Sequence, residues 1–264
     1  MNTLIQDVRY ACRAFLRAPG FALAAVLSLA IGIGANTSVF SVVDALLLHA
    51  LPYKDADRLV ILWNRSPGLN IAQDWFSTAQ YFDIKDGQRS FADVAIAIGG
   101  VENLTGEGEP ERVGVIHVSS NLLPMLGARP EHGRLFVPEE DRPGAAPTAI
   151  LGRGTWTRRY GADPRAIGKQ VTINGKAYQI AGVLPESFSL PREVLPTLNG
   201  AEHADVLLPL PLGPDAAATR SREDYNIIAR LKPGVTARQA QAEMDALTAR
   251  LRQDFPDLYP RTGD

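Results

Sequence analysis

Two hydrophobic patterns follow each other at the start of the chain. In the first twenty residues, apolar side chains recur at helical spacing, at Leu4, Val8, Cys12 and Phe15. From Ala18 to Val43 the chain then runs for 26 residues without Asp, Glu, Lys or Arg. At about 1.5 Å rise per residue, such a helix is about 39 Å long, which exceeds the roughly 30 Å hydrocarbon core of a bilayer. The pattern predicts an amphipathic cytoplasmic helix over residues 1–20 and a transmembrane helix over residues 21–48.

Charged residues around the apolar run predict its orientation. Arg9, Arg13 and Arg17 precede the run with only Asp7 against them, whereas the remaining 244 residues carry 24 basic and 28 acidic side chains. Basic residues collect on the cytoplasmic side of membrane helices, so we expect a cytoplasmic N-terminus and an extracytoplasmic bulk. A cleaved secretory signal is the alternative. The apolar run is long for such a signal, however, and no A-x-A-like cleavage site follows it.

Small residues recur at every fourth position of the apolar run, at Ala24, Ser28, Gly32 and Asn36. This spacing places them on one helical face, where the backbone of another helix could approach closely. The four residues are therefore a candidate helix-packing face. The alternative is that small residues are common in membrane helices for reasons unrelated to packing.

Beyond Asp44 the pattern changes to short apolar runs separated by turn residues, which predicts an α+β domain. The predicted strands cover residues 58–63, 94–98, 112–118, 148–151, 170–173, 177–184 and 225–231. The predicted helices cover residues 78–86, 121–126, 154–160 and 236–255. Asn174-Gly175, between two of these strands, indicates a two-residue hairpin, because a type I′ turn needs positive φ at both central residues.

The last predicted helix has the clearest local signals. Thr236 followed by Gln239 forms a capping-box pattern at its start, and Pro256 follows its end. An apolar stripe runs along it at helical spacing, comprising Ala240, Met244, Leu247, Leu251 and Phe255. Such a stripe predicts packing against the domain core.

Composition and charge exclude several classes of protein. With 45% hydrophobic residues and a formal net charge of -2, the 264-residue chain has enough apolar mass for a core and is not a disordered tail. The near-neutral charge argues against nucleic acid as a partner, since a nucleic-acid binder normally presents a basic face. Cys12 is the single cysteine of the chain, so an internal disulfide and a CxxC metal or redox site are excluded.

Sequence motifs for catalysis are missing from the chain. It contains no G-x-x-x-x-G-K-[ST] phosphate loop, no G-x-S-x-G nucleophile motif and no H-E-x-x-H zinc motif. Its histidines, His49, His117, His132 and His203, lie far apart in sequence. Two acidic runs are expected to be structural. The first, Glu107, Glu109 and Glu111, is expected to be a solvated hairpin tip. The second, Glu139, Glu140 and Asp141, lacks the ligand spacing of a calcium loop. We therefore assign no catalytic, cofactor-binding or metal-binding residue.

Several stretches, in this order, resemble the MacB-like periplasmic core domain of ABC transporter permeases. They are RLVILW at 58–63, the segment VSSNLLPMLGARPEHGRLFVPEEDRPG with its continuation to 188, and ARLKPGVTARQAQAEMDALTARL at 229–251. The N-terminal stretch QDVRYACRAFLRAPGFALAAVLSLAIGIGANTSVFSVVDALLL is similar to the first transmembrane segment of these permeases. The resemblance covers nearly the whole chain and extends to the FtsX/MacB-type permeases that are duplicated in acidobacteria.

The resemblance implies a fold and a division of the chain. One transmembrane helix would be followed by a periplasmic core of porter-like β-α-β units with an inserted, mostly β subdomain. The parts would be residues 49–120 and 216–264 for the porter-like regions, the second of them incomplete, and residues 121–215 for the insertion. Family members continue with another strand and three more membrane helices, so we expect the chain to be the N-terminal portion of a permease or a truncated product.

The resemblance also implies a function without enzymatic activity. The chain would be a permease subunit of the bacterial inner membrane that couples a separate cytoplasmic ABC ATPase to movement outside the membrane, for efflux or for lipoprotein or peptide export. Its partners would be that ATPase, a second permease subunit, the lipid bilayer and a periplasmic adaptor protein, and no cofactor is expected. The alternative is a single-pass anchored sensor or adaptor that binds a protein partner without transport; an anchored hydrolase has almost no support in the sequence.

Overall fold

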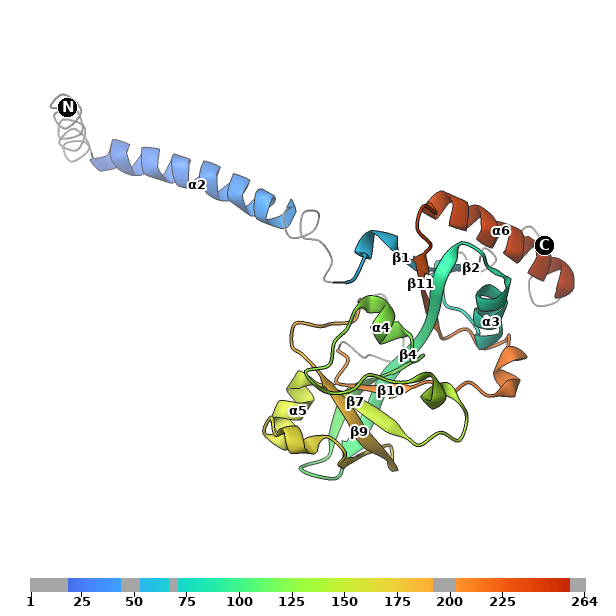
Figure 1. Cartoon of the computed structure of the whole chain (residues 1–264). Helices are drawn as coiled ribbons and strands as arrows, with labels where there is room; N and C mark the ends of the chain where they lie inside the picture. Colours follow the sequence, from blue (N-terminus) through green and yellow to red (C-terminus); the bar gives the residue numbers. More distant parts are fainter. Residues whose placement is uncertain (1–18, 44–52, 67–70, 192–202, 257–264) are drawn as a thin grey trace. The chain divides into compact units, whose positions relative to one another are not determined.

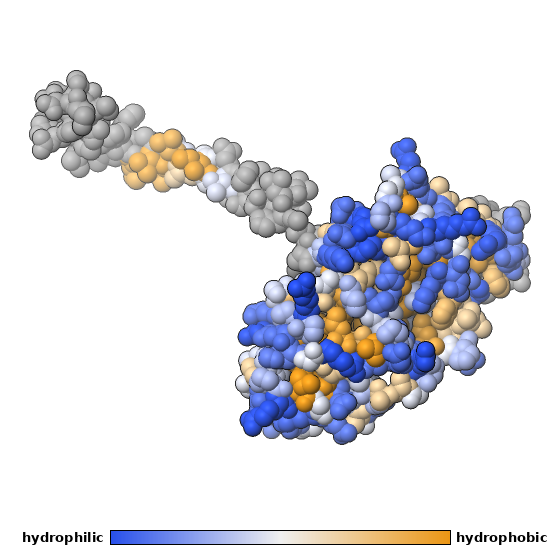
Figure 2. All heavy atoms as spheres, in the orientation of Figure 1, coloured by the Kyte–Doolittle hydropathy of each residue, from blue (hydrophilic) through white to orange (hydrophobic). Residues whose placement is uncertain are grey.

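The computed structural model describes residues 19–43, 53–66, 71–191 and 203–256, which fall into two compact units, Met1–Leu51 and Pro52–Asp264. In the first unit the described residues form one helix, α2 (Pro19–Val43). Its large apolar side chains, among them Leu23, Leu29 and Ile31, are exposed, and they form the orange surface along α2 in Figure 2. Within the described ranges, no helix is long and apolar enough to cross a membrane. The amphipathic helix expected before Pro19 lies outside the described residues.

A nine-stranded mixed sheet forms the second unit (Figure 1). Its strands are β1 (Leu59–Leu62), β4 (Phe91–Thr105), β5 (Glu111–Val118), β6 (His132–Gly133), β7 (Thr148–Gly152), β8 (Gln170–Ile173), β9 (Lys176–Leu184), β10 (Val206–Pro209) and β11 (Asn226–Leu231). They follow the order β1-β11-β4-β5-β10-β7-β9-β6, while β8 pairs with both β4 and β9. Two pairs in this sheet are parallel, β5 with β10 and β7 with β9. A separate two-stranded sheet consists of β2 (Asn64–Ser66) and β3 (Ile71–Asp74).

Helices cover both faces of the sheet, and the side chains buried between the helices and the sheet form the core. The α-helices are α3 (Thr78–Gly87), α4 (Leu122–Leu126), α5 (Arg153–Tyr160) and α6 (Ala237–Asp254), and the short 3-10 helices are η2 (Ala56–Arg58), η4 (Pro138–Asp141), η5 (Pro164–Ala166) and η8 (Pro214–Ala217). Successive residues of β4 point to opposite faces: Ala95 packs in one cluster with α4, and Ile96 in another with α3 and α6. A third cluster contains Trp156 and Tyr160 of α5. The predicted α+β class is confirmed.

Local sequence signals are confirmed where the structure can be compared with them. Asn174 and Gly175 have φ angles of 47° and 79°, and they close the β8–β9 hairpin in which Ile173 faces Lys176. Thr236 caps α6, and its side chain and that of Gln239 accept hydrogen bonds from each other's backbone amides. The stripe on α6 packs inward through Ala240 and Leu247, as predicted.

Several strands differ from the prediction: β4 is longer than predicted, and β2, β3, β6 and β10 were not predicted. β4 extends over 15 residues, from Phe91 through Gly99 and Gly100 to Thr105, whereas only residues 94–98 were predicted. The glycines interrupt the apolar pattern, but pairing with β5, β11 and β8 keeps the backbone extended. β10 was not predicted at all, because its four residues end at Pro209. Its placement between β5 and β7 depends on tertiary pairing.

Candidate functional site

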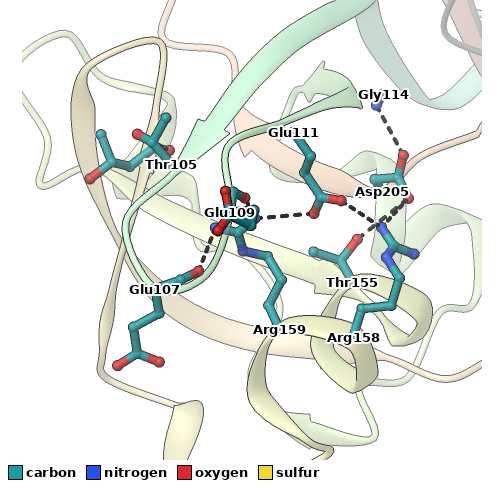
Figure 3. A network of polar contacts seen from close by, with 10 residues as sticks. Thr105, Glu107, Glu109, Glu111, Gly114, Thr155, Arg158, Arg159 and Asp205 are labelled. Atoms are coloured by element: carbon teal, nitrogen blue, oxygen red, sulfur yellow. Dashed lines mark hydrogen bonds and ion pairs between the residues drawn. The ribbon is translucent and has the colours of Figure 1, made fainter.

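A buried arginine holds the tip of the β4–β5 hairpin against α5 (Figure 3). Arg159, whose side chain is only 6% exposed, donates a hydrogen bond from Nη1 to the carbonyl oxygen of Glu109 at 2.6 Å and one from Nη2 to the carbonyl oxygen of Glu107. Its Nη1 also lies 3.4 Å from the carboxylate of Glu111. Glu107 and Glu109 are exposed at the hairpin tip, as expected, whereas Glu111 begins β5 and is partly buried. The buried cation fixes the backbone of the tip.

Asp205 forms the second half of this network (Figure 3). Its carboxylate accepts hydrogen bonds from the Gly114 amide at 3.0 Å and from the Thr155 hydroxyl at 3.4 Å, and it lies 3.6 Å from a guanidinium nitrogen of Arg158. The network therefore joins α5, β5 and the chain that leads into β10. It consists of ion pairs and hydrogen bonds that hold these three elements together.

A cleft of about 690 Å³ lies next to the start of α5. Its lining includes the apolar side chains of Leu184, Phe188 and Leu207 and the basic side chains of Arg153 and Arg158. The volume is in the range of small-molecule sites. Both arginines are paired with carboxylates, Arg153 with that of Glu131 and Arg158 with that of Asp205, so the cleft does not present two free positive charges.

The described histidines occupy three separate positions. His117 on β5 is hydrogen-bonded to Glu102 on β4 at 2.9 Å, His132 on β6 packs on the ring of Trp156, and His203 lines the cleft. His49 lies outside the described residues. Within the described ranges, no three His, Cys, Asp or Glu side chains are placed to hold a metal ion.

The second acidic run stabilises the loop between α4 and β7. Glu140 is buried and accepts hydrogen bonds from the Arg134 guanidinium at 2.9 Å, the Val137 amide at 2.8 Å and the Thr148 hydroxyl at 2.8 Å. Burial acts to raise the pKa of Glu140, but these hydrogen bonds outweigh it and hold the pKa below its ordinary value. Burial raises the pKa of its neighbour Asp141, although that carboxylate accepts two hydrogen bonds from Ser120.

The candidate packing face on α2 is described for three of its four residues. Ala24, Ser28 and Gly32 are exposed, and a Cβ on Gly32 would meet nothing within 4 Å. The side chain of Asn36 lies outside the described residues. Exposure leaves the face accessible to another helix.

Sequence reasoning missed Arg159 and Asp205, although both organise the network. The Gly-Glu alternation at the tip drew attention to the glutamates, whereas the groups that bind are largely their backbone carbonyls. The arginine pair at the end of α5 was a usable signal, because a cation that points toward an acidic turn is favourably placed.

The family model that matches this chain and the solved structures that resemble it describe the same kind of domain. The sequence model of the MacB-like periplasmic core domain matches residues 22–247. No curated protein matches the chain significantly.

Solved structures with a similar fold share little sequence with the chain. The periplasmic region of MacB from Actinobacillus actinomycetemcomitans has a TM-score of 0.53 at 14% identity, over 74% of this chain and 82% of that one. A domain of a protein described as a permease, from Porphyromonas gingivalis, has a TM-score of 0.53 at 17% identity, over 70% of this chain and 76% of that one. At these identities the likeness shows the fold.

Proposed function

The chain belongs to the family of MacB-like periplasmic core domains of ABC transporter permeases, and from this premise we propose that it is a permease subunit, or the N-terminal portion of one. It couples ATP hydrolysis by a separate cytoplasmic ATPase to movement of its extracytoplasmic domain. The observation that carries the proposal is the family match, which extends from within α2 almost to the end of α6.

In this proposal residues 21–48 anchor the chain in the bacterial inner membrane, with residues 1–20 along its cytoplasmic face. The absence of charged residues from Ala18 to Val43 supports the anchor, as do the exposed apolar side chains of α2. The three arginines before the run support a cytoplasmic N-terminus. The packing face of Ala24, Ser28, Gly32 and Asn36 would then contact another membrane helix, in this subunit or in a second permease subunit.

The extracytoplasmic part has three regions in this proposal. Residues 49–120 and 216–264 are the porter-like parts, and residues 121–215 are the insertion. The sheet order supports the division, because the first and last regions supply the adjacent strands β1, β11, β4 and β5, whereas the middle region supplies β6 to β10.

The proposed transport does not require chemistry in this chain. The sequence lacks a phosphate loop, so ATP would be hydrolysed by a partner subunit. The cargo would be an effluxed compound, a lipoprotein or a peptide, received directly or through a periplasmic adaptor protein.

Association with an ATPase tests the proposal. The tagged full chain, crosslinked in membranes of its own host and purified, is expected to carry with it a cytoplasmic ABC ATPase and a permease subunit. Substituting Arg9, Arg13 and Arg17 by Glu should abolish ATPase capture, because the positive-inside bias is then reversed. The matched control makes the same charge change at three exposed arginines of the second unit, Arg112, Arg129 and Arg238, and should retain the ATPase.

A second candidate, an anchored sensor or adaptor that binds a partner without transport, is favoured by the cleft beside α5. The same purification separates the two functions. Capture of an extracytoplasmic protein with no ATPase, in the unaltered chain, would overturn the permease proposal and support this second candidate.

A further inference from the structure

The first described residues of the second unit form a short arm, Tyr53–Arg58, that contacts three distant parts of the domain. The Tyr53 hydroxyl donates to the carbonyl oxygen of Ser189 at 3.1 Å, and its ring packs edge-on against Phe188. The Lys54 amide donates to the carbonyl oxygen of Leu126 at 3.1 Å. These contacts tie the arm to the end of α4 and to the chain that follows β9.

Arg230 is the third attachment of the arm. It lies in β11, all six residues of which are buried, and it is itself only 7% exposed. Its guanidinium donates to the carbonyl oxygens of Asp55 at 2.8 Å and Lys54 at 2.5 Å, and also to that of Met125. One buried cation therefore bridges the arm and α4 from within a strand of the sheet. A buried guanidinium needs such partners, because an unpaired buried charge is strongly unfavourable.

Backbone geometry adapts to this arrangement at two positions. Asp55 has φ 43° and ψ 54°, a left-handed conformation that few residues other than glycine adopt. Its side chain accepts a hydrogen bond from Arg58 at 2.5 Å, and this bond lowers the pKa of Asp55. On the other side Gly127, at the end of α4, has φ 80° and gives Lys54 the room to approach.

The same contacts provide hydrogen-bond donors for the last carbonyl oxygens of α4. A helix leaves its final carbonyl oxygens without partners inside the helix. Here Leu126 accepts from the Lys54 amide and Met125 accepts from Arg230. The end of α4, the arm and β11 thus share one set of hydrogen bonds, and a shift of the arm would break bonds to both elements together.

We propose that Arg230 is a coupling residue that locks the arm to α4 and β11, so that displacement of the chain leaving α2 moves both elements instead of being absorbed by a loose linker. The inference deepens the proposed function and rests on it for the source of the displacement. The lock itself is a property of the second unit and can be tested without any partner.

Hydrogen exchange of the full chain in detergent, followed at single amides, tests the lock. The reporters are the amides of Lys54, Gly127 and Ala128, which bond to Leu126, Pro124 and Leu123 respectively. In Arg230→Met we expect all three amides to exchange faster together, by about tenfold or more. The loss of hydrogen bonds from a charged group lowers the free energy of local opening enough to raise the exchange rate by that factor. Amides of the β4–β5 ladder serve as the internal reference.

Arg230→Lys is a second variant in case Arg230→Met fails to fold. Lysine keeps the positive charge, but its single nitrogen cannot span the arm carbonyls and Met125 with the forked geometry of arginine. We expect the same three amides to exchange faster in a folded protein. The matched control is Arg220→Met: Arg220 is a mostly buried arginine that pairs with Asp83 at 2.5 Å and stacks on Phe255, and its loss should leave the Lys54 amide unchanged.

Two outcomes would overturn the inference. If the Lys54 amide is unaffected in both Arg230 variants, Arg230 does not lock the arm. If Lys54 exchanges faster while Gly127 and Ala128 keep their protection, Arg230 merely holds the arm and does not couple it to α4. Either result is independent of ATPase capture, so failure of the lock and failure of the permease proposal are distinguishable.

Discussion

Lys54 and Gly127 lie so close together that a Cβ on Gly127 would be 2.7 Å from the Cβ of Lys54. Contacts this short do not occur between real Cβ atoms, so the arm can reach the end of α4 only while residue 127 is glycine. Gly127 also has φ 80°, and its amide donates to the carbonyl oxygens of Leu123 and Pro124 within α4. The close approach and the positive φ make two independent demands for the same residue.

Gly127→Ala should therefore lower the free energy of unfolding by about 3 kcal/mol, part of it from the left-handed backbone and the rest from the clash with Lys54. Urea unfolding of the full chain measures the loss. Gly234→Ala is the matched control, because Gly234 has the same φ of 80° with nothing within 4 Å of its Cβ position, and we expect it to cost only about 1–2 kcal/mol. Equal losses in the two variants would show that the approach of Lys54 carries no constraint.

Arg159→Met should loosen the tip of the β4–β5 hairpin. The substitution removes the donor to the carbonyl oxygens of Glu107 and Glu109, which water can partly replace at this exposed tip, and it should lower the free energy of unfolding by about 1–2 kcal/mol. Limited proteolysis should cut the tip faster than in the unaltered chain. Arg165→Met is the control, since the Arg165 side chain is 87% exposed and its ion pair with Asp163 should contribute little. Unchanged cleavage at the tip in Arg159→Met would contradict the role of Arg159.

Local signals in the sequence predicted those elements that neighbouring residues determine. The type I′ turn at Asn174 and the capping box at Thr236 depend on residues within a few positions of each other, and both are present. The burial and the partners of Arg230 could not be predicted in this way. Its acceptors Asp55 and Met125 are 175 and 105 residues away in the chain, so only the tertiary structure decides that this arginine at the end of an apolar strand is buried.

The candidate site shows the same limit. Arg159 and Asp205 organise the network around the hairpin tip, yet they bind groups about 50 to 90 residues distant in the chain. The backbone carbonyls that Arg159 meets and the backbone amide that Asp205 meets have no signature in side-chain chemistry. β10 was missed for a related reason. Its four residues lie between turn-forming residues, and they form a strand only because they pair with β5 and β7.

Glu140→Gln should destabilise the protein at neutral pH but not in acid. Because the folded pKa of Glu140 lies below its ordinary value of 4.5, the ionised carboxylate stabilises the fold above that pH, and this contribution is lost as the pH falls through the folded pKa. We expect a loss of about 1–3 kcal/mol at pH 7 that shrinks below about pH 4.5. Urea unfolding over a pH series measures it; a loss that stays constant down to acid pH would exclude an effect of the charge.

Glu223→Gln should have the opposite effect. Burial raises the pKa of Glu223, with a further contribution from the nearby carboxylate of Asp74. The ionised form is therefore disfavoured in the folded protein, and its cost is present above the folded pKa and disappears as the pH falls below about 4.5. The variant should be more stable at pH 7 by less than about 1 kcal/mol, since the group is half-buried and partly screened. Destabilisation at pH 7 would contradict a net cost of the ionised carboxylate in the folded protein.

Gly32→Leu should weaken association between membrane helices if the small face of α2 is a packing surface. Gly32, Ala24 and Ser28 lie on one side of α2, and a leucine there would hold a partner backbone away from the close contact that small residues allow. Ala30→Leu is the matched control, because Ala30 is two positions from Gly32 and therefore points to the opposite side of the helix. The measurement is energy transfer between labelled copies in lipid bilayers, diluted to separate true association from crowding. A loss in Gly32→Leu with retention in Ala30→Leu is expected; equal transfer in both variants would mean that the fourfold spacing of small residues reflects composition and not contact.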